Sequence, residues 1–152
     1  MRPVRIFKEK YPDCEILADT KIMDAGEYEA EETFKAGADY CTVLGVTDTL
    51  TIEGCVKAAK EYGKQTMVDM ICVKDVKSRI EKMEELGVDI VAVHTGVDQQ
   101  AEGRTPLDDL IEIQKYVKRV KVAVAGGINA KTISSYLECH PEIIIVGGSI
   151  VH

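Results

Sequence analysis

Three charged side chains lie close together in the stretch "ADTKIMDAG". Asp19, Lys21 and Asp24 alternate acid, base and acid there, so the ammonium group can lie between two carboxylates and each charge stabilises the charged form of its neighbour. Carboxylate oxygens are ligands that divalent cations accept, and a lysine ammonium can stabilise an oxyanion that develops during a reaction. The spacing therefore indicates a metal-binding or anion-stabilising site.

Asp69 and His94 stand at the ends of two later apolar segments, "QTMVD" and "DIVAVH". They add a carboxylate and an imidazole that titrates near neutral pH, and both groups are common in proton transfer. Each residue also has a purely structural interpretation, with Asp19 as a helix cap, Lys21 as a solvated side chain and His94 as a hydrogen-bond partner of a nearby loop. Packing explains any one of them alone, but the combination at neighbouring strand ends favours a reactive site.

Two pairs of glycines follow two successive apolar runs, in "AVAGGIN" and "IIVGGSI". Glycine turns expose backbone N–H groups that can bind a phosphate, and βα barrels commonly bind phosphate after their last two strands. A tight turn alone explains a single pair, whereas two consecutive pairs favour an anion site. The predicted phosphate-binding residues are Gly126, Gly127, Gly147, Gly148 and Ser149.

Six short apolar runs rich in β-branched residues predict β-strands that are buried on both faces. They occupy residues 15–19, 40–45, 65–70, 89–94, 120–127 and 142–148. Helical spacing fills most of the segments between them, with the clearest patterns at residues 49–63, 73–87 and 106–120, and the opening residues before Pro12 are also helix-like. This alternation of strand and helix is typical of an α/β protein with a parallel sheet.

Residues at four of the predicted strand ends recur at a constant interval, because Asp19, Leu44, Asp69 and His94 are each 25 positions apart. One βα unit is therefore repeated along the chain. Parallel βα repeats form either an eight-stranded barrel or a doubly wound open sheet, and in both the ligand binds at the carboxyl ends of the strands. Six strands are fewer than a barrel needs, so the count alone favours the open sheet.

Length and composition limit the class of protein. With 152 residues, of which 45% are hydrophobic, we expect one domain over residues 1–152. The net charge of −7 argues against nucleic acid or an anionic membrane surface as a partner. The five cysteines form no C-x-x-C pair, and neither a membrane-spanning run nor a signal peptide is visible, so we expect a cytoplasmic protein.

Taken together, the motifs resemble a known family. "DTKIMDAG" has the Asp-x-Lys-x-x-Asp pattern of the orotidine 5′-monophosphate decarboxylase superfamily. The 3-hexulose-6-phosphate synthase group of that superfamily is similar, in the same order, to "VLGVTDTLTI", "VDMICVKD", "VHTGVDQQAEGRTPLDDL", "VAVAGGIN" and "IIVGGSI". The resemblance implies a (β/α)8 barrel of the TIM type in place of the open sheet, here an incomplete barrel with six parallel strands.

The resemblance also implies a reaction, the Mg2+-dependent aldol condensation of formaldehyde with D-ribulose 5-phosphate. By position, Asp19 is expected to bind Mg2+, Lys21 to stabilise the enediolate intermediate, and Asp24 to reach the site of the neighbouring subunit in a homodimer. His94 is expected to transfer protons and Asp69 to orient substrate hydroxyls. The glycine turns would hold the phosphate.

The 3-keto-L-gulonate-6-phosphate decarboxylases share the Asp-x-Lys-x-x-Asp motif and are the nearest alternative. That family carries an arginine shortly after the strand-end histidine, where this chain has Val97, and a glutamate where it has Asp69. Both differences favour the synthase. A non-catalytic, phosphate-binding fragment of a barrel is a third interpretation of the same residues.

Compared with the family, the sequence lacks two βα units before its first helix and one helix after its last strand. In the family those units supply an aspartate near the substrate and a glutamate of the metal shell. We therefore expect weaker Mg2+ binding and impaired activity, and unpaired edges at the strands that carry Asp19 and Gly147. Arg104 fits equally well as a substrate contact, a contact to the dimer partner or a loop salt bridge.

Overall fold

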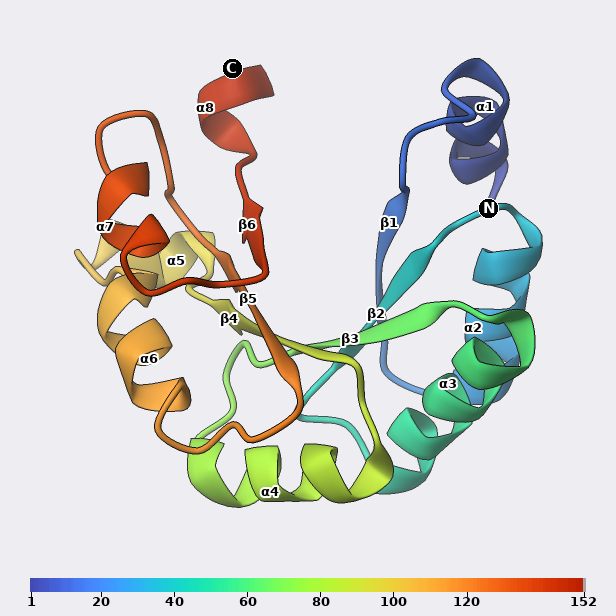
Figure 1. The fold of residues 1–152 in the computed structure, drawn as a ribbon, viewed down its shortest axis with the longest axis horizontal. Helices are drawn as coiled ribbons and strands as arrows, with labels where there is room; N and C mark the ends of the chain where they lie inside the picture. Colours follow the sequence, from blue (N-terminus) through green and yellow to red (C-terminus); the bar gives the residue numbers. More distant parts are fainter. Residues whose placement is uncertain (152) are drawn as a thin grey trace.

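The computed structural model describes residues 1–151, which form one curved parallel sheet with helices on its convex side (Figure 1). The strands pair in chain order from β1 to β6, and every pairing is parallel. Their bounds are β1 (Leu17–Ile22), β2 (Tyr40–Leu44), β3 (Gln65–Asp69), β4 (Ile90–His94), β5 (Lys121–Ala125) and β6 (Ile143–Ile145). This curled half-barrel confirms the prediction of an incomplete barrel with six parallel strands.

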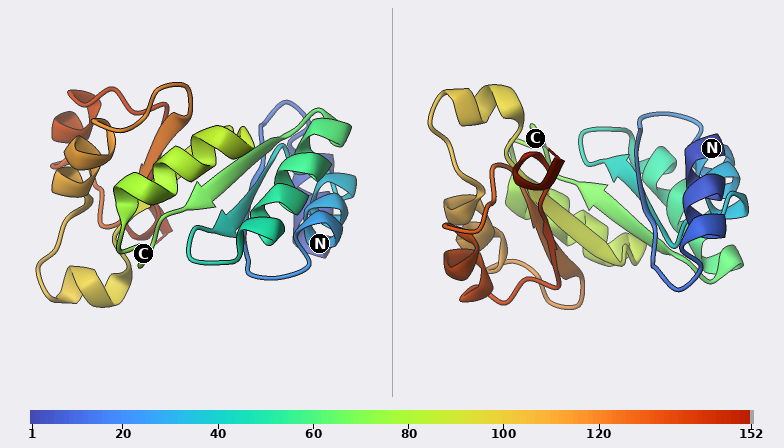
Figure 2. Two further views of the ribbon diagram at one scale, coloured as in Figure 1. Left: turned by 90° about the horizontal axis from the view of Figure 1, so that it is seen from below. Right: turned by 90° about the horizontal axis from the view of Figure 1, so that it is seen from above.

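The helices follow the strands along the outside of the sheet, as the views from below and above show (Figure 2). Each of β1 to β5 is followed by at least one helix before the next strand, so the βα repeat predicted from the sequence is present. The helices of the described residues are α1 (Arg2–Lys10), α2 (Gly26–Lys35), α3 (Thr49–Tyr62), α4 (Val76–Leu86), α5 (Val97–Ala101), α6 (Pro106–Ile113), α7 (Ile133–Leu137) and α8 (Gly148–Val151).

Helices α3 and α4 begin and end at residues that fix their bounds. Asp48 caps α3 by accepting a hydrogen bond from the backbone N–H of Leu50, and Asp75 caps α4 by accepting one from Ser78. Both helices end at a glycine in the left-handed conformation, a common way to satisfy the last carbonyl groups. The predicted bounds of α3 agree with the structure within one residue, and so does the predicted end of α4, whereas α4 begins three residues later than predicted, after its cap Asp75.

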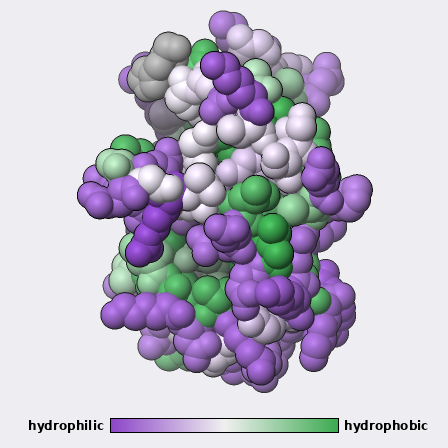
Figure 3. Space-filling model, turned by 90° about the vertical axis from the view of Figure 1, so that its left-hand side faces the viewer, coloured by the Kyte–Doolittle hydropathy of each residue, from purple (hydrophilic) through white to green (hydrophobic). Residues whose placement is uncertain are grey.

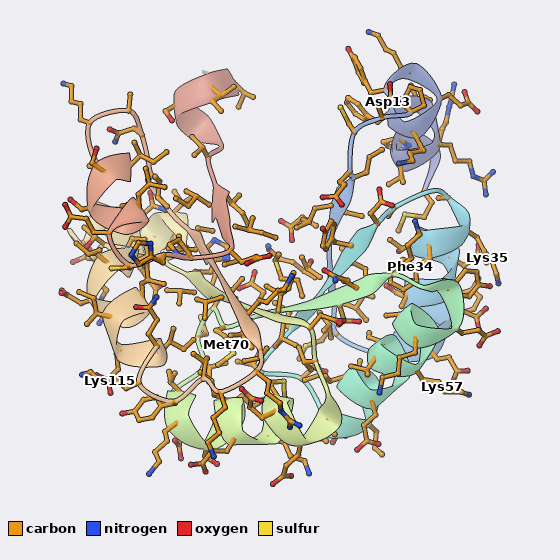
Figure 4. All side chains as sticks on the ribbon, in the orientation of Figure 1. Asp13, Phe34, Lys35, Lys57, Met70 and Lys115 are labelled. Atoms are coloured by element: carbon orange, nitrogen blue, oxygen red, sulfur yellow. The ribbon has the colours of Figure 1, made fainter. Side chains whose placement is uncertain are left out.

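The main core lies between the convex face of the sheet and the helices. Figure 4 shows Phe34 of α2 directed into this layer, while Lys35 and Lys57 point outward, and Phe34 is buried among apolar side chains. A smaller cluster on the concave face consists of Met67, Ile90, Ala92 and Ala123. The concave face is therefore partly apolar.

Two predictions about the elements are wrong. The segment 106–120 is helical only over Pro106–Ile113, and the residues that follow form turns before β5. β1 and β6 are not buried on both faces, because they lie at the two edges of the described sheet and each has one neighbouring strand. The edge positions of β1 and β6 in the described sheet confirm the separate expectation of unpaired edges at the strands that carry Asp19 and Gly147.

The outer surface on the side of α6 and α7 is mostly hydrophilic, with small separate apolar areas (Figure 3). Among the described residues, no helix is both long and apolar enough to cross a membrane.

Candidate active site

A cavity of about 690 Å³ opens on the concave side of the sheet. It lies at the carboxyl ends of the strands, where ligands bind in parallel α/β folds. Nine of the ten residues predicted to form the site line it, namely Asp19, Lys21, Asp69, His94, Gly126, Gly127, Gly147, Gly148 and Ser149. The exception is Asp24.

Strand β1 is distorted where it carries the charged residues. Ala18 pairs with Cys41 and Ile22 pairs with Val43, so four residue steps on β1 are matched by two on β2. Lys21 lies inside this bulge with a φ of 46°, a left-handed conformation that is costly for a residue with a side chain. Bulges re-aim side chains, and this one presents both Asp19 and Lys21 to the cavity.

The Lys21 ammonium group bridges two carboxylates. Its Nζ atom is 2.8 Å from each carboxylate oxygen of Asp19 and 3.1 Å from Oδ2 of Asp69. Partial burial alone would lower the pKa of Lys21, but the hydrogen bonds to Asp19 and Asp69 outweigh burial and raise it. Lys21 therefore stays cationic at neutral pH and is suited to stabilise negative charge rather than to accept a proton.

Asp69, the last residue of β3, is buried, with 5% of its side chain exposed. Its carboxylate accepts hydrogen bonds from Lys21, from His94 Nδ1 at 2.9 Å and from the backbone N–H of Ile71 at 2.9 Å. Burial alone would raise the pKa of Asp69, but the hydrogen bonds from His94 and Ile71 outweigh it and lower the pKa. The buried carboxylate is thus ionised and fully occupied by donors.

The contact with Asp69 decides which ring nitrogen of His94 can act as a base. An ionised carboxylate only accepts hydrogen bonds, so Nδ1 of His94 must carry the proton in that contact. In the neutral ring the other nitrogen, Nε2, then has a free lone pair. Because His94 also lines the cavity, its Nε2 is placed where a general base could act, and Asp69 sets the tautomer of the ring.

The two glycine turns lie on the other half of the cavity. Gly126 and Gly127 have φ values of 120° and 66°, which favour glycine, and a Cβ atom on Gly126 would lie only 2.5 Å from the carbonyl oxygen of Thr95. Ser149 Oγ donates a hydrogen bond to the Ile128 carbonyl at 3.1 Å and so joins the second turn to the first. The turns offer a backbone-lined wall opposite the charged residues.

Asp24 is exposed near the start of α2 and does not line the cavity. Its Oδ1 atom accepts a hydrogen bond from the backbone N–H of Ala25 at 2.8 Å. Within the described chain it is therefore not brought together with Asp19 and Lys21, although it is close to them in sequence. Its role at the site of a neighbouring subunit stays a prediction.

A family model for "Orotidine 5′-phosphate decarboxylase / HUMPS family" matches residues 1–152. The chain belongs to this orotidine 5′-phosphate decarboxylase family. The match covers all six strands and the Asp-x-Lys-x-x-Asp motif, which begins in β1.

Several family members are similar along nearly the whole chain. A protein of Bacillus subtilis (strain 168) named 3-hexulose-6-phosphate synthase is 48% identical over 150 residues, which are 99% of this chain and 71% of that protein. The crystal structure of 3-hexulose-6-phosphate synthase from Salmonella typhimurium is 54% identical, with a TM-score of 0.97, over 99% of this chain and 72% of that one. Both relatives are longer than this chain.

The decarboxylase branch of the family is more distant. The structure of 3-keto-L-gulonate-6-phosphate decarboxylase from Vibrio cholerae O1 biovar El Tor str. N16961 is 22% identical, with a TM-score of 0.84, over 96% of this chain and 69% of that one. At this identity the likeness concerns the fold. The branch with the higher identity is the one whose members are named synthases.

Magnesium binding, which the family resemblance implies, fits these residues in a limited way. Mg2+ is often held by one or two carboxylates together with water and substrate oxygens. The side chain of Asp19 is 57% exposed and faces the cavity, so it can offer oxygen to a cation, whereas Asp69 is enclosed by donors. Among residues 1–151 no three His, Cys, Asp or Glu side chains are grouped as a preformed metal centre. A cation bound here would need further oxygen ligands, from water or from a substrate.

Three polar residues that line the cavity were not predicted as site residues. Thr42 donates a hydrogen bond to Asp19, Gln100 donates one to the Thr95 carbonyl beside the first glycine turn, and Asn129 follows that turn. Thr42 has one sequence signal, because it is a polar residue within the apolar run "YCTVL". Gln100 lies in the short helix α5, which the apolar pattern did not reveal.

Proposed function

We propose that the chain is a 3-hexulose-6-phosphate synthase, an aldolase that joins formaldehyde to D-ribulose 5-phosphate to give D-arabino-hex-3-ulose 6-phosphate. One observation carries the proposal: a cationic lysine, an ionised aspartate and an oriented histidine form a continuous hydrogen-bonded chain that faces two glycine turns across one cavity. The similarity to proteins named synthases at 48% and 54% identity supports the same substrate class.

The residues suggest the following sequence of proton transfers. The glycine turns bind the phosphate and leave the keto end of the pentulose near Lys21 and His94. His94 Nε2 removes the C1 proton, and the ammonium of Lys21 stabilises the negative charge that develops on the enediolate. C1 of the enediolate then forms a bond to the carbon of formaldehyde, and the protonated His94 gives its proton to the alkoxide that formaldehyde becomes. Asp69 keeps the His94 ring in the required tautomer.

Mg2+ is part of this proposal, with Asp19 as its ligand from the described residues. When bound, the cation would polarise the carbonyl and the adjacent hydroxyl of the substrate. Lys21 Nζ now contacts both carboxylate oxygens of Asp19, so metal binding requires the contact with Lys21 to rearrange, while the Thr42 hydroxyl can keep its hydrogen bond to Oδ1. We therefore expect Mg2+ to bind more tightly in the presence of the sugar phosphate than in its absence.

We also propose a homodimer in which Asp24 approaches the site of the partner subunit, and a cytoplasmic location. The exposure of Asp24, outside the cavity of its own chain, supports the first point. The five cysteines, all without disulfides, support the second, because cytosolic thiols are kept reduced.

Formaldehyde consumption tests the proposed function. The chain should consume formaldehyde only when D-ribulose 5-phosphate and Mg2+ are both present. Release of carbon dioxide from 3-keto-L-gulonate 6-phosphate would favour the decarboxylase instead. Isothermal titration with D-ribulose 5-phosphate tests the interpretation as a non-catalytic, phosphate-binding fragment. Binding that does not depend on Mg2+ and is not followed by turnover would favour that interpretation.

A further inference from the structure

Thr42 lies in the middle of β2 and is buried, with 3% of its surface exposed. It pairs with Met67 of the concave apolar cluster, and it lines the cavity beside Asp19 and Lys21. A hydroxyl group buried at this position requires hydrogen-bond partners, because an unpaired polar group in the interior is costly. Its partners all belong to the bulge of β1.

Four hydrogen bonds join Thr42 to that bulge. The Thr42 hydroxyl accepts from the backbone N–H of Lys21 and donates to Asp19 Oδ1, each at 2.9 Å. The other two involve Thr20, whose hydroxyl donates to the Thr42 carbonyl at 2.8 Å and accepts from the Thr42 N–H at 3.2 Å. The two threonine side chains thus replace the backbone ladder that the bulge interrupts.

We propose that Thr42 is a positioning residue that fixes the left-handed backbone of Lys21 and the carboxylate of Asp19 for the proposed reaction. The inference rests on the proposed function for its effect on catalysis, but its geometry stands independently. The hydroxyl gives the strained Lys21 N–H an acceptor and holds one carboxylate oxygen of Asp19 in place. Without the Thr42 hydroxyl, the remaining hydrogen-bond partner of the Asp19 carboxylate is the flexible side chain of Lys21.

Thr42→Val tests the proposal because valine has the same shape but neither accepts nor donates a hydrogen bond. Loss of a group that orients a ligand or catalytic residue typically lowers activity or metal affinity about 10- to 100-fold. We expect kcat to fall by that factor and KM for the sugar phosphate to change less than about threefold, since the glycine turns lie on other strands. Thr42→Ser, which keeps the hydroxyl, should restore most of kcat.

Thr66→Val is the matched control. Thr66 is equally buried, in the neighbouring strand β3, but its hydroxyl bonds to the Cys55 carbonyl on the helix side of the sheet. The Thr66→Val variant should lose about as much stability as Thr42→Val but should keep the kcat of the unaltered chain. If Thr66→Val lowers kcat as much as Thr42→Val, the effect is one of general stability and the proposal is overturned.

Amide hydrogen exchange of Lys21, measured by NMR, is independent of activity. In Thr42→Val the Lys21 N–H should exchange at least about tenfold faster than in the unaltered chain, and in Thr42→Ser and Thr66→Val it should keep its protection. Unchanged protection in Thr42→Val would overturn the proposal even if the proposed function is correct. Conversely, an unaltered chain without turnover would refute the proposed function, and the exchange data would still decide the role of Thr42.

Discussion

Replacing Asp69 with asparagine tests the hydrogen-bonded chain at its centre. Oδ1 of Asp69 accepts from the Ile71 N–H and contacts His94 Nδ1, while Oδ2 contacts His94 Nδ1 and Lys21 Nζ. Asparagine has nearly the same shape but one oxygen is replaced by an NH2 group, which only donates. In either orientation of the amide, a donor therefore faces another donor.

Each orientation has a calculable consequence. If the amide oxygen stays on Ile71, the NH2 group faces Lys21 Nζ and the closer contact of His94 Nδ1. The repulsion between the two donors then favours the tautomer of His94 that has its proton on Nε2, in which Nδ1 accepts from the NH2 group. The base is then in the wrong tautomer, and we expect kcat to fall by about 100- to 10,000-fold, the usual contribution of general base catalysis. If the amide is flipped, the Ile71 N–H loses its acceptor at a cost of about 1–3 kcal/mol.

The stability effect should depend on pH in a defined direction. The pKa of Asp69 is lowered in the folded state, because hydrogen bonds from His94 and Ile71 outweigh the burial that would raise it. Ionised Asp69 therefore stabilises the fold above its unfolded pKa, and this contribution is lost as pH falls through the folded pKa. The difference in free energy of unfolding between Asp69→Asn and the unaltered chain should be about 1–3 kcal/mol at pH 7 and should shrink at acidic pH.

Urea unfolding and formaldehyde-consumption kinetics measure these two effects in the same samples. Asp75→Asn is the matched control, since Asp75 is an exposed cap of α4 and asparagine caps a helix about as well as aspartate. It should leave both stability and kcat nearly unchanged. Full kcat in Asp69→Asn would refute the assignment of His94 as a base oriented by Asp69.

Three further predictions follow from the same geometry. Lys21→Ala removes the proposed oxyanion donor and His94→Gln the proposed base, so each should lower kcat at least about 100-fold while circular dichroism shows an intact fold. Retained activity in both variants would contradict these two proposed roles. Gly126→Ala should lower the free energy of unfolding by more than about 1 kcal/mol, because the φ of Gly126 is 120° and the new Cβ would lie 2.5 Å from the Thr95 carbonyl oxygen. Gly147→Ala, whose Cβ would have no atom within 4 Å, should keep the stability and raise KM for the sugar phosphate. Equal stability of the two variants would argue against this reasoning. Glu84 accepts hydrogen bonds from the backbone N–H groups of residues 118–120; burial alone would raise its pKa, but these bonds outweigh burial and lower the pKa from 4.5 to about 2. The stabilising effect of ionised Glu84 should therefore be complete above pH 4.5 and lost as pH falls toward 2. Glu84→Gln should remove this pH dependence from the free energy of unfolding measured with urea.

Much of the fold could be predicted from the sequence because its signals are local. β-branched runs identify the strands, and glycines identify the C-terminal ends of α3 and α4. The constant interval also identified Leu44, Asp69 and His94, each of which is the last residue of its strand. The length of the helix that follows Pro106 was mispredicted, since its apolar pattern continues into turns beyond Ile113.

The site could be predicted by residue but not by mechanism. Asp19 was expected at a strand end, yet β1 continues to Ile22 because the bulge adds residues that no sequence pattern marks. The role of Asp69 in orienting substrate hydroxyls stays a prediction. The sequence did not predict the contacts of its carboxylate with Lys21, His94 and a backbone N–H, which only the folded sheet brings together. Strand register, rather than composition, decides such partnerships.

The most direct test of the central claim is an NMR measurement with 13C-labelled formaldehyde. The chain is incubated with D-ribulose 5-phosphate and Mg2+, and the fate of the label is followed. A synthase transfers the label to a new hydroxymethyl carbon of a hexulose phosphate, and Lys21→Ala or removal of Mg2+ by a chelator should abolish that signal. Label that remains in free formaldehyde, with the folded chain and all reactants present, would contradict the proposed carbon–carbon bond formation.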